Sequence, residues 1–296
     1  MLERGGARTA VIETARASGL LLAEPSVQTA LAAHSYGSGQ LIAAALDAGA
    51  TEIVLGLGGS AMTDGGAGAL RALGLEIYDR LGNPIPLGGA ELVLARKLDA
   101  SGLDPRLQAV ELRIAADVQN PLHGPEGAAR IFGAQKGADL AALDLLDDGL
   151  RRWAGLIEAA TGKDVNVPGA GAAGGFPSGF LGFTGARLES GFSLVAELTG
   201  LDAELDQADL VITGEGAMDA QSEYGKAPLA VADRAHARGL PVVVIAGKIT
   251  LGPQQLAAHG VEAAVSLLDL AGSPEEAFAQ AAKYVAWATQ QALEGA

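Results

Sequence analysis

Residues 51–68 read TEIVLGLGGSAMTDGGAG, and this stretch decides the fold class. Its first seven residues are mostly apolar, which is typical of a strand buried inside a sheet. Ala-rich sequence around 40–48 and after Gly68 predicts a helix on each side of that strand. The glycines between the strand and the second helix allow a tight turn. This order of elements indicates an α/β fold.

Short apolar runs alternate with Ala-rich stretches along the rest of the chain. Between 140 and 157, leucines, Trp153 and Ile157 recur at steps of three or four, which predicts one buried face of a long helix. Two successive strand–helix–strand crossovers in the C-terminal part require a parallel sheet. We place the domain boundary at the end of the glycine-rich stretch 169–185, which predicts domains at 1–185 and 186–296. Strands are predicted at 51–57, 112–118, 210–214, 241–247 and 263–267.

Charge and composition limit the classes of function. The 296 residues carry a formal net charge of -15, which argues against a nucleic-acid partner because phosphate contacts need a Lys/Arg-rich face. No apolar run is long enough to predict a membrane span, and the first residues lack the pattern of a signal peptide. The chain has no cysteine, which is compatible with the cytoplasm that we expect. An anion site in so acidic a protein must be built locally, from backbone N–H groups and a few cations.

The first candidate site is the glycine loop at 56–68. Such a loop between a strand and a helix can surround an anion with backbone N–H groups, so Gly58, Gly59 and Ser60 are predicted to bind phosphate or substrate. Asp64 is a catalytic candidate, because it could accept a hydroxyl proton. The structural alternative is that Asp64 caps the following helix and the glycines only turn the chain.

The second candidate site follows the predicted strand at 210–214. Gly214 and Gly216 are predicted to bind phosphate through their N–H groups, with Lys226 offsetting its charge. Glu215 and Asp219 are candidate ligands for Mg²⁺, which prefers carboxylate oxygens. The alternative is a capped turn in which Ser222 caps a helix and Glu215 is solvated.

The third candidate site follows the predicted strand at 112–118. Asp117 lies at the end of that strand, which is a typical place for a catalytic residue in a parallel sheet. Asn120 and Lys136 are candidates for binding substrate or phosphate. The alternative for Asp117 is a turn that leads into Pro121. We expect all three loops to converge at one edge of a sheet.

Taken in this order, the loops resemble the bacterial glycerate kinase family of the two-domain type. The matching stretches are GLGGSAMTDGGAGALRALG at 56–74, ADVQNPLHGPEGAARIFGAQKGA at 116–138, PGAGAAGGF at 168–176 and LVITGEGAMDAQSEYGKAP at 210–228. The resemblance implies a mixed α/β domain at 1–185 and the C-terminal part of a Rossmann-like domain at 186–296. It also implies phosphorylation of glycerate with ATP and Mg²⁺, with 2-phosphoglycerate as the expected product.

Within that reading, Asp64 or Asp117 orients or deprotonates the acceptor hydroxyl, and Lys136 or Lys226 meets phosphate or the glycerate carboxylate. The expected partners are glycerate and a nucleotide, with no nucleic acid and no membrane, and self-association would cover an open sheet edge. Two motifs that family members carry near their start, Asp-Ser-Phe-Lys-Gly and Asp-Gly-Gly-Glu-Gly, are not in this sequence. The alternative function is therefore a shortened, non-catalytic relative that binds a small acid or nucleotide.

Overall fold

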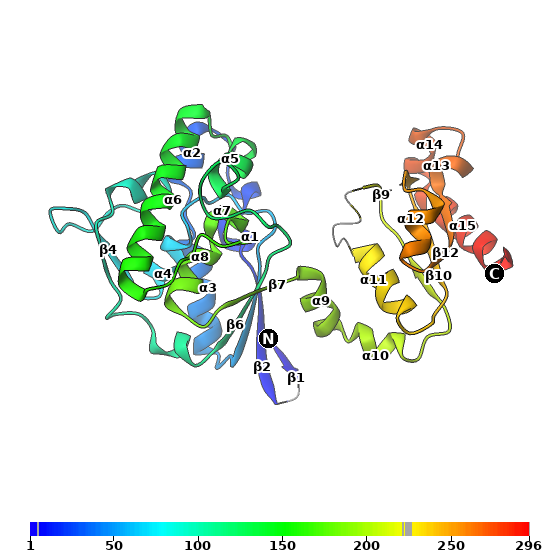
Figure 1. Cartoon of the computed structure of the whole chain (residues 1–296), viewed down its shortest axis with the longest axis horizontal. Helices are drawn as coiled ribbons and strands as arrows, with labels where there is room; N and C mark the ends of the chain where they lie inside the picture. Colours follow the sequence, from blue (N-terminus) through cyan, green and yellow to red (C-terminus); the bar gives the residue numbers. More distant parts are fainter. Residues whose placement is uncertain (5, 221, 223–226, 296) are drawn as a thin grey trace. The chain divides into compact units, whose positions relative to one another are not determined.

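The computed structural model describes residues 1–4, 6–220, 222 and 227–295, and it divides the chain into two compact units (Figure 1). Unit 1 comprises Met1–Gly191 and unit 2 comprises Phe192–Ala296. The predicted boundary, after residue 185, lies inside unit 1, because Arg187–Glu189 still forms a strand of the unit 1 sheet. The assignment of 1–185 and 186–296 as the family's two domains stays a prediction.

Unit 1 is built on a five-stranded sheet with the order β1-β2-β3-β6-β7. β1 pairs antiparallel with β2, whereas β2, β3, β6 and β7 are parallel, with Ile12 beside Leu55 and Leu55 beside Ile114. The carboxyl ends of the parallel strands therefore meet at one edge of the sheet. The strands are β1 (Leu2–Arg4), β2 (Ala7–Glu13), β3 (Glu52–Gly56), β6 (Glu111–Ala115) and β7 (Arg187–Glu189).

One face of this sheet packs against helices and forms the core. The predicted long helix is α6 (Leu140–Thr161), which begins where the Asp139 carboxylate accepts a hydrogen bond from Ala142 N and ends at Gly162. Its buried face includes Trp153, whose Nε1 donates to Gly65 O at 2.9 Å. The predicted helical face is thus correct from Leu143 to Ile157, whereas Leu140, in the first turn, is exposed. The buried face packs directly on the first glycine loop. The other helices of unit 1 are α1 (Ala15–Ser18), α2 (Val27–Ala32), α3 (Tyr36–Asp47), α4 (Ala67–Ala72), α5 (Ala128–Phe132), α7 (Ala172–Gly175) and α8 (Pro177–Phe183).

Short elements complete the unit. A hairpin of β4 (Glu76–Tyr78) and β5 (Lys97–Asp99) forms a separate antiparallel pair. The 3-10 helices are η1 (Leu20–Leu22), η2 (Ala90–Leu94), η3 (Pro105–Gln108) and η4 (Ala134–Lys136). Of these, η1 and η4 contribute to the candidate site.

A polar ladder crosses four neighbouring strands of the unit 1 sheet. Arg113 on β6 pairs with Glu52 on β3 at 2.9 Å and with Glu189 on β7 at 2.8 Å. Thr9 on β2 donates its hydroxyl to Glu52 at 2.5 Å. The side chains of Arg113 and Glu52 are 13% and 14% exposed, so each charge depends on its partner for solvation.

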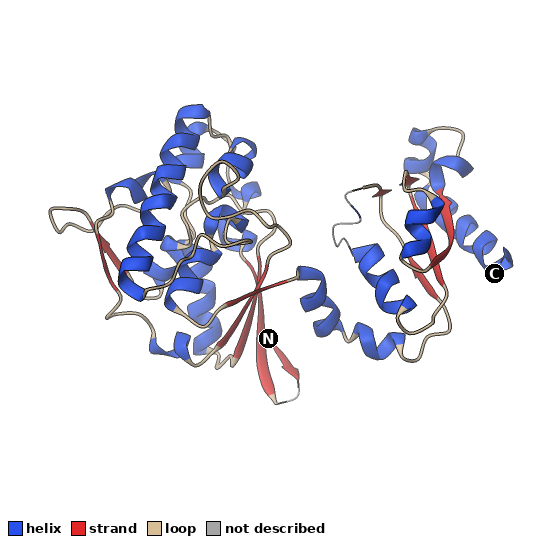
Figure 2. Ribbon diagram, in the orientation of Figure 1, coloured by secondary structure: helices blue, strands red, loops and turns tan. Residues whose placement is uncertain are grey.

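Unit 2 contains a three-stranded parallel sheet with the order β12-β10-β8. β10 alternates its side chains: Val242 and Val244 join the core with α11 and α12, whereas Val243 and Ile245 pack with Tyr284 of α15. Helices therefore cover both faces of the sheet, as in Rossmann-like folds (Figure 2). The sheet strands are β8 (Val211–Thr213), β10 (Val242–Ala246) and β12 (Val261–Ser266), beside the short parallel pair β9 (Ala217–Met218) and β11 (Lys248–Ile249). The helices are α9 (Gly191–Thr199), α10 (Leu201–Leu205), α11 (Ala227–His236), α12 (Pro253–Ala258), α13 (Leu267–Leu270), α14 (Pro274–Ala279) and α15 (Ala281–Gly295).

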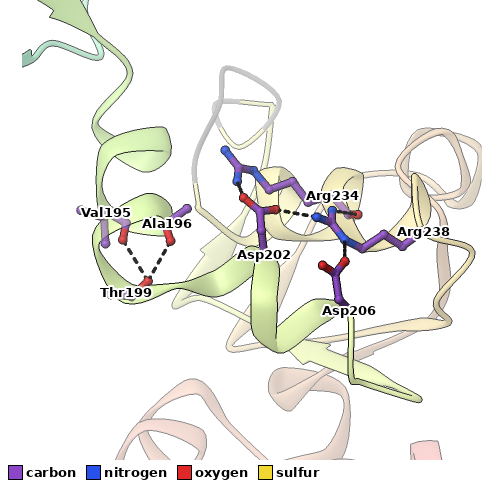
Figure 3. A network of polar contacts seen from close by, with 7 residues as sticks. All are labelled: Val195, Ala196, Thr199, Asp202, Asp206, Arg234 and Arg238. Atoms are coloured by element: carbon purple, nitrogen blue, oxygen red, sulfur yellow. Dashed lines mark hydrogen bonds and ion pairs between the residues drawn. The ribbon is translucent and has the colours of Figure 1, made fainter. Parts of the chain in front are cut away.

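A network of ion pairs fastens α10 to α11 (Figure 3). Asp202 accepts from Arg234 Nη1 at 2.6 Å and from Arg238 Nη2 at 2.9 Å, and Asp206 accepts from Arg238 Nε at 2.8 Å. The hydrogen bond that Arg238 donates to Asp206 is the main reason that the pKa of Arg238 is raised. These pairs make the segment after the unit boundary part of unit 2. Among the described residues, no helix is both long and apolar enough to cross a bilayer.

Candidate active site

A cavity of about 430 Å³ opens in unit 1 at the carboxyl ends of β3 and β6. It brings together five predicted site residues from three separate segments, namely Gly58, Gly59, Ser60, Asp117 and Lys136. Leu20 of η1 and the stretch from Ala172 to Ala173 complete opposite parts of the wall. This is the edge of a parallel sheet where ligands commonly bind. Its lining consists of Leu20, Leu57, Gly58, Gly59, Ser60, Ala115, Ala116, Asp117, Val118, Phe132, Gln135, Lys136, Ala172 and Ala173.

The glycine loop presents free backbone donors to this cavity. Leu20 N donates to Gly59 O at 2.8 Å and Ala61 N donates to Ser18 O at 2.9 Å, which holds the loop in place. Gly59 has a φ of 70°, a conformation that favours glycine. In the described part of the chain, the N–H groups of Gly58 and Gly59 donate to no protein acceptor. They are therefore available to an anionic ligand.

Lys136 supplies a buried positive charge. The residue is only 4% exposed. Its Nζ donates to Met62 O at 2.6 Å and to Thr63 Oγ1 at 3.3 Å. Burial lowers the pKa of Lys136 to about 8, against the opposing attraction of the Asp64 carboxylate. An ammonium group has three protons, so one donor remains for a ligand. At neutral pH this lysine is mostly charged and can offset an oxyanion in the cavity.

Asp117 is exposed, directly beyond the end of β6. Its Oδ1 accepts a hydrogen bond from Gly191 N, the first residue of α9, at 2.7 Å. A Cβ on Gly191 would lie 2.7 Å from Asp117 Oδ2, so a larger residue at 191 requires this carboxylate to shift. The free carboxylate lone pairs can accept a proton from a bound hydroxyl.

Asp64 lies deeper, outside the lining of the cavity. It is 1% exposed, and its carboxylate accepts hydrogen bonds from Ser35 N and Ser35 Oγ, both at 2.8 Å. It also accepts from Gly66 N at 3.2 Å and from Gly68 N at 3.1 Å. This geometry matches the capping alternative, in which Asp64 ties the loop to α3 and α4. Its assignment as a catalytic residue stays a prediction that this geometry does not favour.

Asn120 forms hydrogen bonds that hold its own loop in place. Its Nδ2 donates to Glu126 O at 2.9 Å, and its own carbonyl accepts from Gly171 N at 2.9 Å. The side chain is not part of the cavity lining. Asn120 therefore joins the loop after β6 to the glycine-rich stretch, and its role in substrate binding stays a prediction.

The loop after β8 belongs to unit 2 and follows a different sheet, so the expectation that all three loops share one sheet edge is wrong. A Cβ on Gly214 would lie 1.8 Å from Ile245 O, because the backbones of two neighbouring strands nearly touch there. Ser222 Oγ donates to Glu215 Oε1 at 2.5 Å and accepts from Asp219 N at 3.2 Å, which draws the turn together. Lys226 lies outside the described residues.

The turn that holds Glu215 and Asp219 is compatible with Mg²⁺ but is not a complete cage for it. Among the described residues, no group of three His, Cys, Asp or Glu side chains is arranged to hold a metal ion. Mg²⁺ in kinases commonly takes one or two carboxylates and completes its shell with water and phosphate oxygens. Two carboxylates on one turn fit that donor set.

Sequence reasoning missed two parts of the site. Ala173 lines the cavity with a φ of 48°, and among described residues it is the one non-glycine with a positive φ. Gly191 holds Asp117 from 74 positions further along the chain. The run of glycines at 169–175 was the available signal for the first, whereas no local pattern marks the second.

An α/β fold whose glycine loops and buried lysine form an oxyanion cavity is typical of enzymes that bind small acidic or phosphorylated molecules. The family model described as the glycerate kinase family matches residues 1–295. The chain belongs to the glycerate kinase family. It is therefore an enzyme of the kinase class, a phosphotransferase with an alcohol acceptor, and membership of a kinase family implies the use of ATP.

Three similar proteins illustrate the relationship. The chain is 46% identical over 275 residues to the glycerate 2-kinase of Escherichia coli K12, covering 93% of this chain and 72% of that protein. It is 45% identical over 277 residues to a glycerate kinase of Halalkalibacterium halodurans, covering 93% and 73%. A crystal structure of a glycerate kinase 2 from Salmonella typhimurium LT2 matches with a TM-score of 0.78 and 44% identity, covering 88% of this chain and 68% of that one. None of these relatives favours the non-catalytic alternative.

Proposed function

We propose that this enzyme transfers the γ-phosphoryl group of ATP to the 2-hydroxyl of D-glycerate, giving 2-phosphoglycerate. The observation that carries the proposal is the cavity in which free N–H groups, a buried ammonium and an open carboxylate face one small volume. Glycerate carries a carboxylate, which can accept hydrogen bonds from the N–H groups and the ammonium group. It also carries two hydroxyls, either of which can donate to the carboxylate of the cavity. The regiochemistry follows the name of the E. coli relative, a glycerate 2-kinase.

In the proposed binding mode, the glycerate carboxylate accepts hydrogen bonds from Gly58 N, Gly59 N and the third N–H of Lys136. Ser60 Oγ, at the same wall of the cavity, donates to a further substrate oxygen. Because the protein carries a formal net charge of -15, this local grouping of donors must overcome a field that repels anions. Lys136 does so from a desolvated position, where its charge is least screened.

In the transfer step, the 2-hydroxyl oxygen of glycerate forms a bond to the γ-phosphorus of ATP. The bond from that phosphorus to the oxygen that bridges it to the β-phosphate breaks, and ADP leaves. Asp117 accepts the hydroxyl proton, and its hydrogen bond from Gly191 N fixes the orientation of the carboxylate. Catalysis is mostly positioning and charge stabilisation, as in other phosphoryl transfers.

Glu215 and Asp219 are the residues that we assign to Mg²⁺, and the N–H groups of Gly214 and Gly216 are assigned to phosphate oxygens. When bound, the ion neutralises phosphate charge as it accumulates during transfer. Lys226 is assigned to the same phosphates. We further propose a cytoplasmic location, with glycerate and ATP as the partners and self-association of the chain.

The test is an assay of ADP release with D-glycerate and MgATP, with the product identified by ³¹P NMR. We expect 2-phosphoglycerate, and an Asp117→Asn variant with kcat reduced at least about a hundredfold. The matched control is Asp148→Asn, which changes an exposed aspartate on α6 and should leave kcat unchanged. Release of 3-phosphoglycerate would refute the regiochemistry, and full activity of Asp117→Asn would remove that residue from the mechanism.

A further inference from the structure

The wall of the cavity that includes Ala173 has an unusual backbone. Ala173 has φ 48° and ψ 43°, and Gly174 has φ 68° and ψ 30°, so two successive residues are left-handed inside α7. A side chain in this region costs free energy, and such residues persist where the surrounding structure fixes them, often at ligand sites. Ala173 is therefore a conformational outlier that lies directly at the candidate active site.

The surrounding structure does fix this turn. A Cβ on Gly174 would lie 2.0 Å from Met62 O, so the turn packs closely against the segment that accepts the hydrogen bond from Lys136. Gly174 O accepts from Gly65 N at 3.1 Å, and a Cβ on Gly171 would lie 2.3 Å from Pro121 O. The turn is thus tied to the loops that carry the other site residues.

The turn also leaves two backbone donors without a protein partner. Gly175 N and Phe176 N donate within the stretch, at 3.3 Å and 3.4 Å. In the part of the chain covered by the structure, the N–H groups of Ala173 and Gly174 reach no protein acceptor. Gly174 is buried and Ala173 is half-buried at the cavity wall, and N–H groups in such places are rarely left unpaired.

We propose that the N–H groups of Ala173 and Gly174 form an oxyanion-binding subsite at the part of the cavity wall that Ala173 lines, in the same cavity as Lys136. Successive N–H groups in a turn of this kind create a concave, electropositive surface that binds carboxylate or phosphate oxygens. The subsite gives the glycine-rich stretch 169–175 a direct role in binding, and it gives the left-handed backbone at Ala173 a function. The proposal rests on the proposed function only in that both use the same cavity.

The shared chemistry is an oxyanion, which either the acid or the phosphoryl group can supply. NMR of ¹⁵N-labelled protein, titrated separately with D-glycerate and with inorganic phosphate, distinguishes the two sources. We expect the amide resonances of Ala173 and Gly174 to shift in at least one titration, while those of Gly155 and Gly185, which face open space, stay in place. The titration that moves them identifies the group bound.

A backbone substitution tests the donor itself. Replacing Ala173 by L-lactic acid keeps the methyl group and removes only the N–H. We expect the Kd of the ligand that shifts these amides to rise at least about tenfold, because the lost hydrogen bond is to a charged group. The control replaces Ala141, an exposed residue in the first turn of α6 whose N–H has no helical partner, and should leave the Kd unchanged.

The outcomes separate the subsite from the function. Shifts at Gly58 and Gly59 without shifts at Ala173 and Gly174 would overturn the subsite and leave the proposed function in place. An unchanged Kd in the lactic acid variant would also overturn the subsite. Turnover of glycerate with no shift at any of these four amides would overturn both the subsite and the proposed acceptor cavity.

Discussion

Replacing Gly191 by alanine is the sharpest test of how Asp117 is held. The new Cβ would lie 2.7 Å from Asp117 Oδ2 and 3.2 Å from Oδ1. Because real Cβ contacts are longer than the first of these distances, either the carboxylate or the start of α9 must move. We expect the carboxylate, the end of an exposed side chain, to turn away and to lose the 2.7 Å hydrogen bond from Gly191 N to Asp117 Oδ1.

The magnitude follows from that hydrogen bond. A hydrogen bond to a charged group contributes about 1.5–3 kcal/mol, so its loss at the step that needs Asp117 lowers kcat by about 10- to 150-fold. The KM for glycerate should change much less, because the donors assigned to the glycerate carboxylate are the N–H groups of Gly58 and Gly59 and the ammonium group of Lys136.

The assay couples ADP release to NADH oxidation and measures kcat and KM separately. Gly185→Ala is the matched control: Gly185 lies in unit 1 shortly before β7, in open space, and the change should leave kcat and KM unchanged. Thermal unfolding verifies that both variants are folded. If Gly191→Ala keeps kcat within about twofold while Asp117→Asn loses activity, Asp117 does not need this anchor and the reasoning fails.

Three further predictions concern stability. Burial lowers the pKa of Lys136 from 10.5 to about 8, so between these pH values the unfolded chain binds more protons than the folded one. The free energy of unfolding should therefore rise across pH 8–10 by up to about 3 kcal/mol. Urea titrations of Lys136→Met should lack that rise, and the same pH dependence in both proteins would refute the prediction. Arg113→Met should lower the free energy of unfolding by about 2–4 kcal/mol, since the carboxylates of Glu52 and Glu189, 14% and 29% exposed, lose their partner. The milder Glu189→Gln should lower it by less than half as much. Equal effects of the two variants would contradict the role given to Arg113 in the polar ladder. Gly214→Ala should unfold unit 2 or lower its Tm strongly, because the Cβ would lie 1.8 Å from Ile245 O, whereas Gly216→Ala, which faces open space, should keep the Tm.

Local patterns in the chain were enough for the class of fold. The apolar run at 51–57 is β3, and the three-to-four-residue spacing from 143 to 157 is the buried face of α6. The two C-terminal crossovers are parallel, as their strand–helix–strand order requires. These features depend on neighbours within about one element, so the sequence carries them directly.

The site depended on segments far apart in the chain. The sequence makes Asp64 a catalytic candidate. In the structure, Ser35, 29 positions away, donates hydrogen bonds to its carboxylate from both its backbone N–H and its hydroxyl. The pKa of Lys136 is lowered because surrounding segments remove it from water, and Ala173 is left-handed beside Gly174, where an added Cβ would lie 2.0 Å from Met62 O. The sequence by itself determined the main parallel strands, the long helix, the glycine loops and the family. Only the tertiary structure decided which polar groups face the cavity, because burial and hydrogen-bond partners are properties of the packed chain.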